Sequence, residues 1–150
     1  MLIEPAHPEH ASALTEIAVS AKRHWNYPER WIELWIPSLT ISPEYISKHE
    51  AWMAVSNQRP VGFYTLKFEN KDLWLDNLWI LPEFMGRGIG RRLFQHALER
   101  SKTLSATLLK IEADPNAVEF YEKMGARKVG EHHSEVDGQP RILPLMEINL

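Results

Sequence analysis

One stretch decides the fold of this chain: Leu78-Trp79-Ile80-Leu81-Pro82-Glu83-Phe84-Met85-Gly86-Arg87-Gly88-Ile89-Gly90-Arg91-Arg92-Leu93. An apolar strand runs to a proline, a loop with three glycines in five residues follows, and an amphipathic helix begins directly after it. Free backbone N–H groups and a helix N-terminus are therefore expected where a strand has just ended. Together with the arginines of the loop, these donors suit a diphosphate.

The spacing of the glycines separates this loop from two familiar phosphate-binding loops. The dinucleotide fingerprint G-x-G-x-x-G fails, because its third glycine position holds Arg91 or Leu93. The P-loop G-x-x-x-x-G-K-[ST] fails as well, since Arg91 and Arg92 stand where glycine and lysine belong. A turn that merely joins strand to helix remains the alternative. The cluster of arginines in a chain of net charge -3 favours phosphate binding.

Length and composition limit the class of protein. The chain has 150 residues, of which 44% are hydrophobic and 25% charged, so we expect a single soluble domain over 1–150. The net charge of -3 argues against a nucleic-acid or membrane partner. There is no cysteine, and residues 1–10 do not resemble a signal peptide. We therefore expect a protein of a reducing compartment, the cytoplasm.

Hydrophobic periodicity predicts a mixed α/β fold with the glycine loop near its middle. The expected element order is β-α-α-β-β-β-α-β-α-β-β, with a further small helical piece from Ser42. The strands are expected at 2–5, 51–55, 61–68, 73–81, 108–113, 126–131 and 141–149. The helices are expected from Pro8, from Glu29 to Trp35 with Pro37 ending the helix, from 88 to 102 and after Asp114.

A second informative stretch runs from Asp114 to Ala126. Asp114-Pro115 is a strong helix start, a side-chain cap followed by proline at the first helical position. The helix presents Tyr121, whose phenol is either core filler or a proton donor to a leaving group. Taken alone, this helix favours the core interpretation.

The two stretches together resemble a known family. Met85-Gly86-Arg87-Gly88-Ile89-Gly90 is similar to the acetyl-CoA signature [QR]-x-x-G-x-[GA] of the GNAT superfamily of N-acetyltransferases. The segment 116–125, Asn-Ala-Val-Glu-Phe-Tyr-Glu-Lys-Met-Gly, resembles its later element N-A-x-x-F-Y-E-K-x-G. The motifs cover about 73–131, and the element order extends the resemblance over the chain. Met85 departs from the usual Gln or Arg, which removes one polar side chain but no backbone donor.

The resemblance implies a central, mostly antiparallel sheet with a V-shaped splay between its fourth and fifth strands, flanked by helices. Acetyl-CoA is the implied co-substrate, with its pantetheine arm along the backbone of Leu78, Trp79 and Ile80. The residues implied to receive its diphosphate are Met85, Gly86, Arg87, Gly88, Ile89, Gly90 and Arg91. Asn116 would touch the cofactor arm, and Tyr121 would protonate the departing thiolate.

The implied reaction is direct attack of a primary amine on the thioester, without a covalent acyl-enzyme, so the lack of cysteine is no obstacle. The Ile80 N–H would stabilise the oxyanion. Asp76 ranks ahead of Glu112 as general base on proximity, although either carboxylate could instead pair with a cation or face solvent. The rival hypothesis is a non-catalytic acyl-CoA-binding or regulatory module, against which Tyr121 favours an enzyme.

The acceptor site is expected in the helical segment near the N-terminus and the last strands. Trp25, Tyr27 and Trp31 are candidates to line it, and packing of the first helices is an equally good explanation for them. The acceptor is expected to be a small-molecule or peptide amine. Seven histidines form no three-ligand pattern, so no metal is expected. The closing strands leave room for a homodimer.

Overall fold

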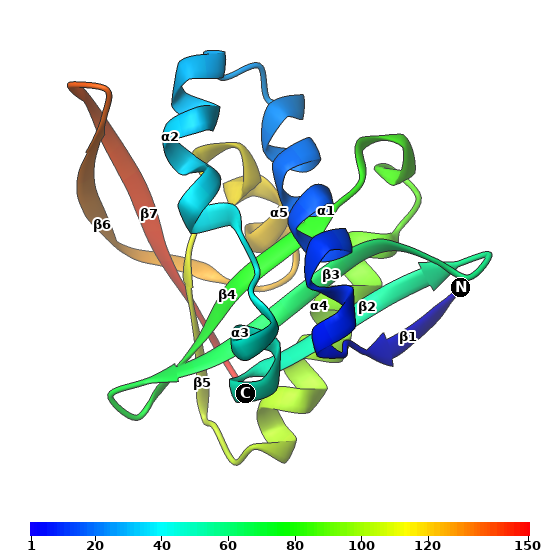
Figure 1. Ribbon diagram of the computed structural model, residues 1–150. Helices are drawn as coiled ribbons and strands as arrows, with labels where there is room; N and C mark the ends of the chain where they lie inside the picture. Colours follow the sequence, from blue (N-terminus) through cyan, green and yellow to red (C-terminus); the bar gives the residue numbers. More distant parts are fainter.

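A computed structural model describes residues 1–150 (Figure 1). Its core is a seven-stranded sheet with the strand order β1-β2-β3-β4-β5-β7-β6. Every neighbouring pair is antiparallel except β4 and β5, which run parallel. The predicted fold class is confirmed, a mixed α/β fold with a mostly antiparallel central sheet.

The bounds of the elements agree with most of the predicted ranges. The strands are β1 Leu2–Pro5, β2 Glu50–Ser56, β3 Arg59–Glu69, β4 Asp72–Ile80, β5 Leu108–Glu112, β6 Arg127–Val136 and β7 Gln139–Asn149. The α-helices are α1 Ala11–His24, α2 Glu29–Leu39, α3 Pro43–Lys48, α4 Ile89–Thr103 and α5 Val118–Lys123. Three 3₁₀ turns complete the list, η1 Pro8–His10, η2 Pro82–Phe84 and η3 Pro115–Ala117.

The antiparallel strands are joined by three tight hairpins. Each hairpin has a two-residue turn, at 57–58, 70–71 and 137–138, and both residues of each turn have positive φ. Such turns match the right-handed twist of the flanking strands and favour Asn, Asp and Gly. Local turn chemistry therefore fixes the register of β2–β3–β4 and of β6–β7.

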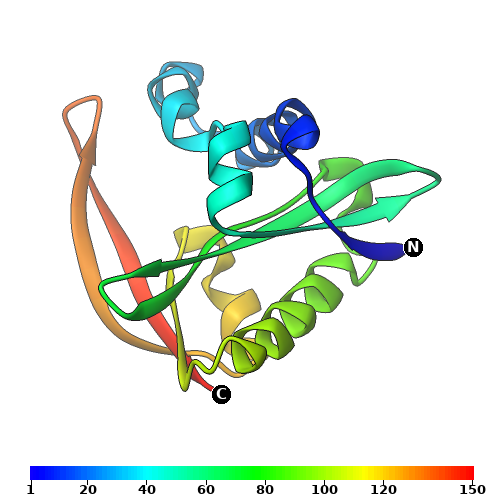
Figure 2. The ribbon, with the colours of Figure 1, turned by 60° about the horizontal axis from the view of Figure 1, so that its bottom comes forward.

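Helices cover both faces of the sheet (Figure 2). Helices α1, α2 and α3 lie on one face, while α4 and α5 lie on the other. Helix α4 buries its apolar stripe of Ile89, Leu93, Phe94 and Ala97 against the sheet, as its 3.6-residue spacing predicts. Helix α1 does the same with Leu14, Ile17, Ala18 and Ala21. No helix combines the length and apolar character that a membrane span requires.

The predicted splay between the fourth and fifth strands is present. Strand β4 pairs with β5 only from Leu73 to Leu75. On its other edge β4 stays paired with β3 as far as Ile80, with a register shift that leaves Asp76 as an extra residue. A bulge of this kind bends its strand and increases its twist. The strand thus turns away from β5 at Asp76, and the backbone beyond it has no strand partner on that side.

Three details of the predicted elements are wrong. Helix α2 does not end at Pro37 but continues to Leu39, because a proline there costs a single backbone donor and Thr40 N–H still closes the last turn on Ile36 O at 3.0 Å. The helices expected from Pro8 and after Asp114 each begin with a separate 3₁₀ turn. Strand β6 extends well beyond 131, since the hairpin turn at 137–138 pairs it with β7 throughout.

Candidate active site

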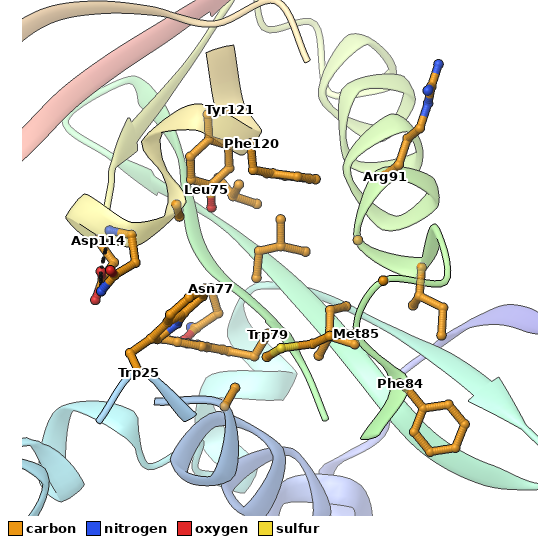
Figure 3. A pocket seen from close by; sticks show the side chains of 18 of the residues that line it. Trp25, Leu75, Asn77, Trp79, Phe84, Met85, Arg91, Asp114, Phe120 and Tyr121 are labelled. Atoms are coloured by element: carbon orange, nitrogen blue, oxygen red, sulfur yellow. Dashed lines mark hydrogen bonds between the residues drawn. The ribbon is translucent and has the colours of Figure 1, made fainter. Parts of the chain in front are cut away.

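The splayed strands open onto a cavity of about 540 Å³ (Figure 3). Its wall collects most of the residues predicted for the cofactor and the chemistry. These are Leu78, Trp79, Ile80, Met85, Gly86, Gly88, Ile89, Gly90, Arg91, Asn116, Tyr121 and Asp76, with Trp25 from the acceptor set. Arg87, Tyr27 and Trp31 do not line it. Residues of β4, the glycine loop and the second motif, which the sequence predicts for one site, therefore line one cavity.

The glycine loop leads directly into the first turn of α4. Gly86 and Gly88 have φ of 77° and 81°, a left-handed conformation that a side chain disfavours, and Gly88 is the N-cap of the helix. A Cβ placed on either glycine would meet nothing within 4 Å. The N–H groups of the first helical turn have no acceptor inside the helix. The loop therefore offers backbone donors to the cavity, with Arg91 beside them and the Arg87 guanidinium 4.9 Å from the Phe84 ring.

Tyr121 stands on α5 and turns its hydroxyl into the cavity. Its ring packs between Phe94 and Phe120, with centroid distances of 5.7 and 5.3 Å. The hydroxyl has no hydrogen-bond partner in the chain, and its oxygen is not fully buried. Burial, and then the negative charge of Asp114, raise the pKa of the Tyr121 phenol, which keeps it protonated. Both interpretations of this residue hold in part, since its ring is core and its oxygen faces the site.

Asp76 lies at the bulge, at the end of a chain of hydrogen bonds that starts in the cofactor wall. Trp79 Nε1 donates to Asn77 Oδ1 at 3.0 Å, and Asn77 Nδ2 donates to Thr65 Oγ1 at 2.9 Å. The Tyr45 hydroxyl lies 3.0 Å from Thr65 Oγ1 and donates to the Asp76 carboxylate. The chain of bonds holds Asp76 and the Trp79 indole in fixed orientations. Tyr45 was not predicted as a site residue, because only the tertiary fold brings Tyr45 on α3 beside Asp76 on β4.

Glu112, the second candidate base, also lines the cavity. Its Oε1 lies 2.9 Å from His132 Nδ1 on β6. Asp76 and Glu112 thus stand on the two strands that diverge, each directly after the last residue that its strand pairs with the other. The geometry offers two carboxylates for proton removal, one bonded to a tyrosine and the other to a histidine.

Asp114 does more than start a helix. Its Oδ1 accepts from the Asn116 N–H at 2.9 Å, which is the predicted cap. Its Oδ2 also lies 2.6 Å from Lys22 Nζ. Burial acts to raise the pKa of the Asp114 carboxyl, but the ion pair with Lys22 and these hydrogen bonds outweigh it, and the pKa is lowered. Burial lowers the pKa of Lys22, with Asp114 opposing it.

The lowered pKa predicts how Asp114 contributes to stability at different pH. A folded-state pKa below the unfolded one gives stability that is complete above an ordinary carboxyl pKa of about 4 and is lost as pH falls through the lower folded value. Urea unfolding of the wild type and Asp114→Asn should therefore show a stability difference that shrinks from about pH 6 to about pH 3. A difference that stays constant over that interval would contradict the assignment.

The three acceptor candidates lie in different surroundings. Trp25 is 40% exposed and lines the cavity. Tyr27 and Trp31 pack instead into an aromatic group with Trp35, with ring centroids 5.0 to 6.1 Å apart. For Tyr27 and Trp31 the packing interpretation thus accounts for the contacts, and only Trp25 faces the cavity.

A sheet opened between two parallel strands, with a glycine loop and a tyrosine facing the slot, is the arrangement that the sequence resemblance implies for an acetyl-CoA-dependent acetyltransferase. Residues 11–126 match the model of the acetyltransferase (GNAT) family. The chain belongs to this family. The predicted family membership and the predicted co-substrate, acetyl-CoA, are confirmed.

Known proteins agree with this assignment. The chain is 36% identical over 106 residues to the peptidyl-lysine N-acetyltransferase YjaB of Salmonella typhimurium. The aligned residues cover 70% of this chain and 68% of that protein. A GCN5-related N-acetyltransferase of Rhodopseudomonas palustris has the same fold, with a TM-score of 0.83 at 23% identity, over 99% of this chain and 95% of that one. PaiA N-acetyltransferase of Thermoplasma acidophilum, solved with coenzyme A, gives a TM-score of 0.77 at 22% identity over the whole of both chains.

Proposed function

We propose that this protein transfers the acetyl group of acetyl-CoA to a primary amine by direct attack. The observation that carries the proposal is that the glycine loop, the unpaired edge of β4 and the Tyr121 hydroxyl share one cavity. Pantetheine takes the place of a strand beside Leu78, Trp79 and Ile80, and the diphosphate lies on the loop and the start of α4. The Asn116 amide contacts the pantetheine arm.

Each step of the reaction has a residue in the cavity wall. A carboxylate, Asp76 first and Glu112 second, removes a proton from the ammonium of the acceptor. The free amine attacks the thioester carbon, and the N–H of Ile80 stabilises the negative charge that forms on the oxygen. The C–S bond then breaks with its electron pair on sulfur, the nitrogen loses its second proton to solvent, and Tyr121 gives the thiolate its proton. Solvent returns a proton to Tyr121 and takes the proton held by the carboxylate.

A lysine side chain in a peptide is the acceptor to test first. The Salmonella relative is a peptidyl-lysine N-acetyltransferase, and the two carboxylates in the cavity wall suit a cationic amine. A small-molecule amine is the other acceptor class. A single domain working in the cytoplasm stays a prediction from the sequence, as does a homodimer, for which β6 offers its unpaired edge.

An acceptor screen tests the proposal. Purified protein with acetyl-CoA and a panel of lysine peptides, polyamines and amino acids should release free CoA with at least one amine, measured with a thiol reagent. Acetyl-CoA alone should raise Tm, because a ligand that binds only the folded state stabilises it. Stabilisation without turnover on any amine would favour the non-catalytic acyl-CoA-binding module. No stabilisation at saturating acetyl-CoA would contradict both functions.

A further inference from the structure

Five side chains from four segments meet where Asp114 and Asn116 line the cavity, and we call them the Asp114 cluster: Lys22, Tyr27, Asp114, Asn116 and Arg141. The Tyr27 hydroxyl lies 3.0 Å from both carboxylate oxygens of Asp114. Asn116 Nδ2 donates to the Tyr27 hydroxyl and to Asp114 Oδ1, both at 3.0 Å. The Arg141 guanidinium reaches Asp114 Oδ2 at 3.2 Å and the Tyr27 hydroxyl at 3.3 Å.

The cluster is charged and almost completely shielded from solvent. The side chains of Lys22, Arg141 and Asp114 are only 9%, 11% and 12% exposed. Two cations share one carboxylate, and the ring of Trp35 lies 4.4 Å from Lys22 Nζ and 4.7 Å from the Arg141 guanidinium carbon. Desolvated charges are tolerated only where the geometry of their partners is good. The cluster therefore holds its members in one arrangement.

The members come from parts of the chain that lie far apart in the sequence. Lys22 belongs to α1, Tyr27 to the α1–α2 connection, Asp114 and Asn116 to the start of η3, and Arg141 to β7. Asp114 and Asn116 also line the cavity. The same carboxylate thus fixes the predicted cofactor contact Asn116 and, through Arg141, the β6–β7 hairpin.

A second arginine joins the same hairpin to the helices in a different environment. Arg30 Nε on α2 lies 2.8 Å from Asp137 Oδ1 at the hairpin turn, where the two side chains are 70% and 34% exposed. An exposed pair of this kind contributes little. The buried Arg141 contact is therefore the stronger of the two arginine contacts between the hairpin and the helical side, and Arg30 provides a matched comparison.

We infer that Asp114 and Arg141 are positioning residues that couple the cofactor slot to the acceptor wall, because one buried carboxylate holds both Asn116 and the β6–β7 hairpin. A cofactor that binds Asn116 then further stabilises, through Asp114 and Arg141, the α1–α2 connection and the hairpin beside the incoming amine. The inference rests on the proposed function and assigns a role to residues outside the predicted chemistry.

The variant that tests the coupling is Arg141→Gln. It leaves Lys22 and Asp114 as a balanced pair, so the fold and the cap on Asn116 are retained. We expect kcat/KM for the amine to fall about tenfold, mainly through a higher KM, because misplacement of a reactant is costly. The Kd for CoA should change less than about threefold, a split that a general loss of structure would not produce. Arg141→Lys, which keeps the charge, should recover part of the loss.

Hydrogen exchange gives a readout that does not depend on turnover. In the wild type, CoA should slow exchange of backbone amides in β6–β7 and around Tyr27, and in Arg141→Gln this protection should be lost. Arg30→Gln should keep both the protection and kcat/KM within about threefold of the wild type.

The two hypotheses fail in different ways. Unchanged KM and unchanged protection in Arg141→Gln, with an active wild type, would overturn the coupling alone. Absence of CoA binding and turnover in the wild type would overturn the proposed function.

Discussion

Replacing Tyr121 by phenylalanine is expected to lower kcat for amine acetylation by about 10²–10⁴, the range that a positioned general acid contributes. The phenol oxygen faces the cavity and has no partner in the chain. Its removal should therefore change the free energy of unfolding by less than about 1 kcal/mol. The KM for acetyl-CoA should stay close to that of the wild type, since the ring and its packing are retained. Steady-state release of CoA with a good amine acceptor measures both constants.

Tyr64→Phe is the matched control for this prediction. Tyr64 on β3 is another buried tyrosine, and its hydroxyl lies 2.7 Å from His96 Nδ1, outside the cavity wall. The Tyr64→Phe variant loses the same single oxygen atom. Because this oxygen lies outside the cavity wall, kcat should stay within about threefold of the wild type. If Tyr121→Phe turned over as fast as this control, Tyr121 would not be the acid.

Gly88→Ala is expected to weaken acetyl-CoA binding by about 100-fold, which is about 2.7 kcal/mol. Gly88 has a φ of 81°, and its missing Cβ would point into open space within the cavity wall. A methyl group there keeps the diphosphate from approaching the backbone donors of the loop. The rise in Tm that acetyl-CoA gives the wild type should accordingly be lost. Calorimetric titration with CoA gives the change in Kd directly.

Gly138→Ala separates the strain of the substitution from its effect on the ligand. Gly138 in the β6–β7 turn also has positive φ, 75°, and open space around its Cβ, but it lies outside the cavity wall. Both variants place alanine in the left-handed region, at a cost of about 1–2 kcal/mol. Only Gly88→Ala should lose affinity for CoA. Equal losses in the two variants would assign the effect to backbone strain instead of to the diphosphate seat.

The parts of the site that were predictable from sequence are those encoded locally. The glycine loop, the helix it starts and the cap at Asp114 each depend on a few adjacent residues, and all are found where the sequence places them. The hairpin turn at 137–138 is equally local. The resemblance to a family then supplied what short segments cannot, namely that the two motifs face one cavity across a splayed sheet.

The rest of the site depends on contacts between distant segments. Lys22 and Asp114 are 92 positions apart, and Tyr27 and Arg141 are 114 apart. Nothing in the neighbourhood of Lys22 marks it as buried, since a lysine on a helix is normally exposed. The mixture of aromatic and polar residues around Tyr27 makes it a candidate for an acceptor pocket, with packing as an equal alternative, whereas the fold commits its hydroxyl to Asp114. Partner choice over such separations follows from topology alone.

The short parallel seam between β4 and β5 has a consequence for folding. It is three residues long on each strand, and it is the only place where the sheet pairing of β1–β4 meets that of β5–β7–β6. The hairpins β2–β3–β4 and β6–β7 are closed by tight turns and form from neighbouring segments, whereas the seam, like the pairings β1–β2 and β5–β7, joins segments more than thirty residues apart. Contacts between distant segments form more slowly than local ones. We therefore expect the β2–β3–β4 and β6–β7 hairpins to form before the seam, so that the slot for the cofactor is completed late in the folding of the chain.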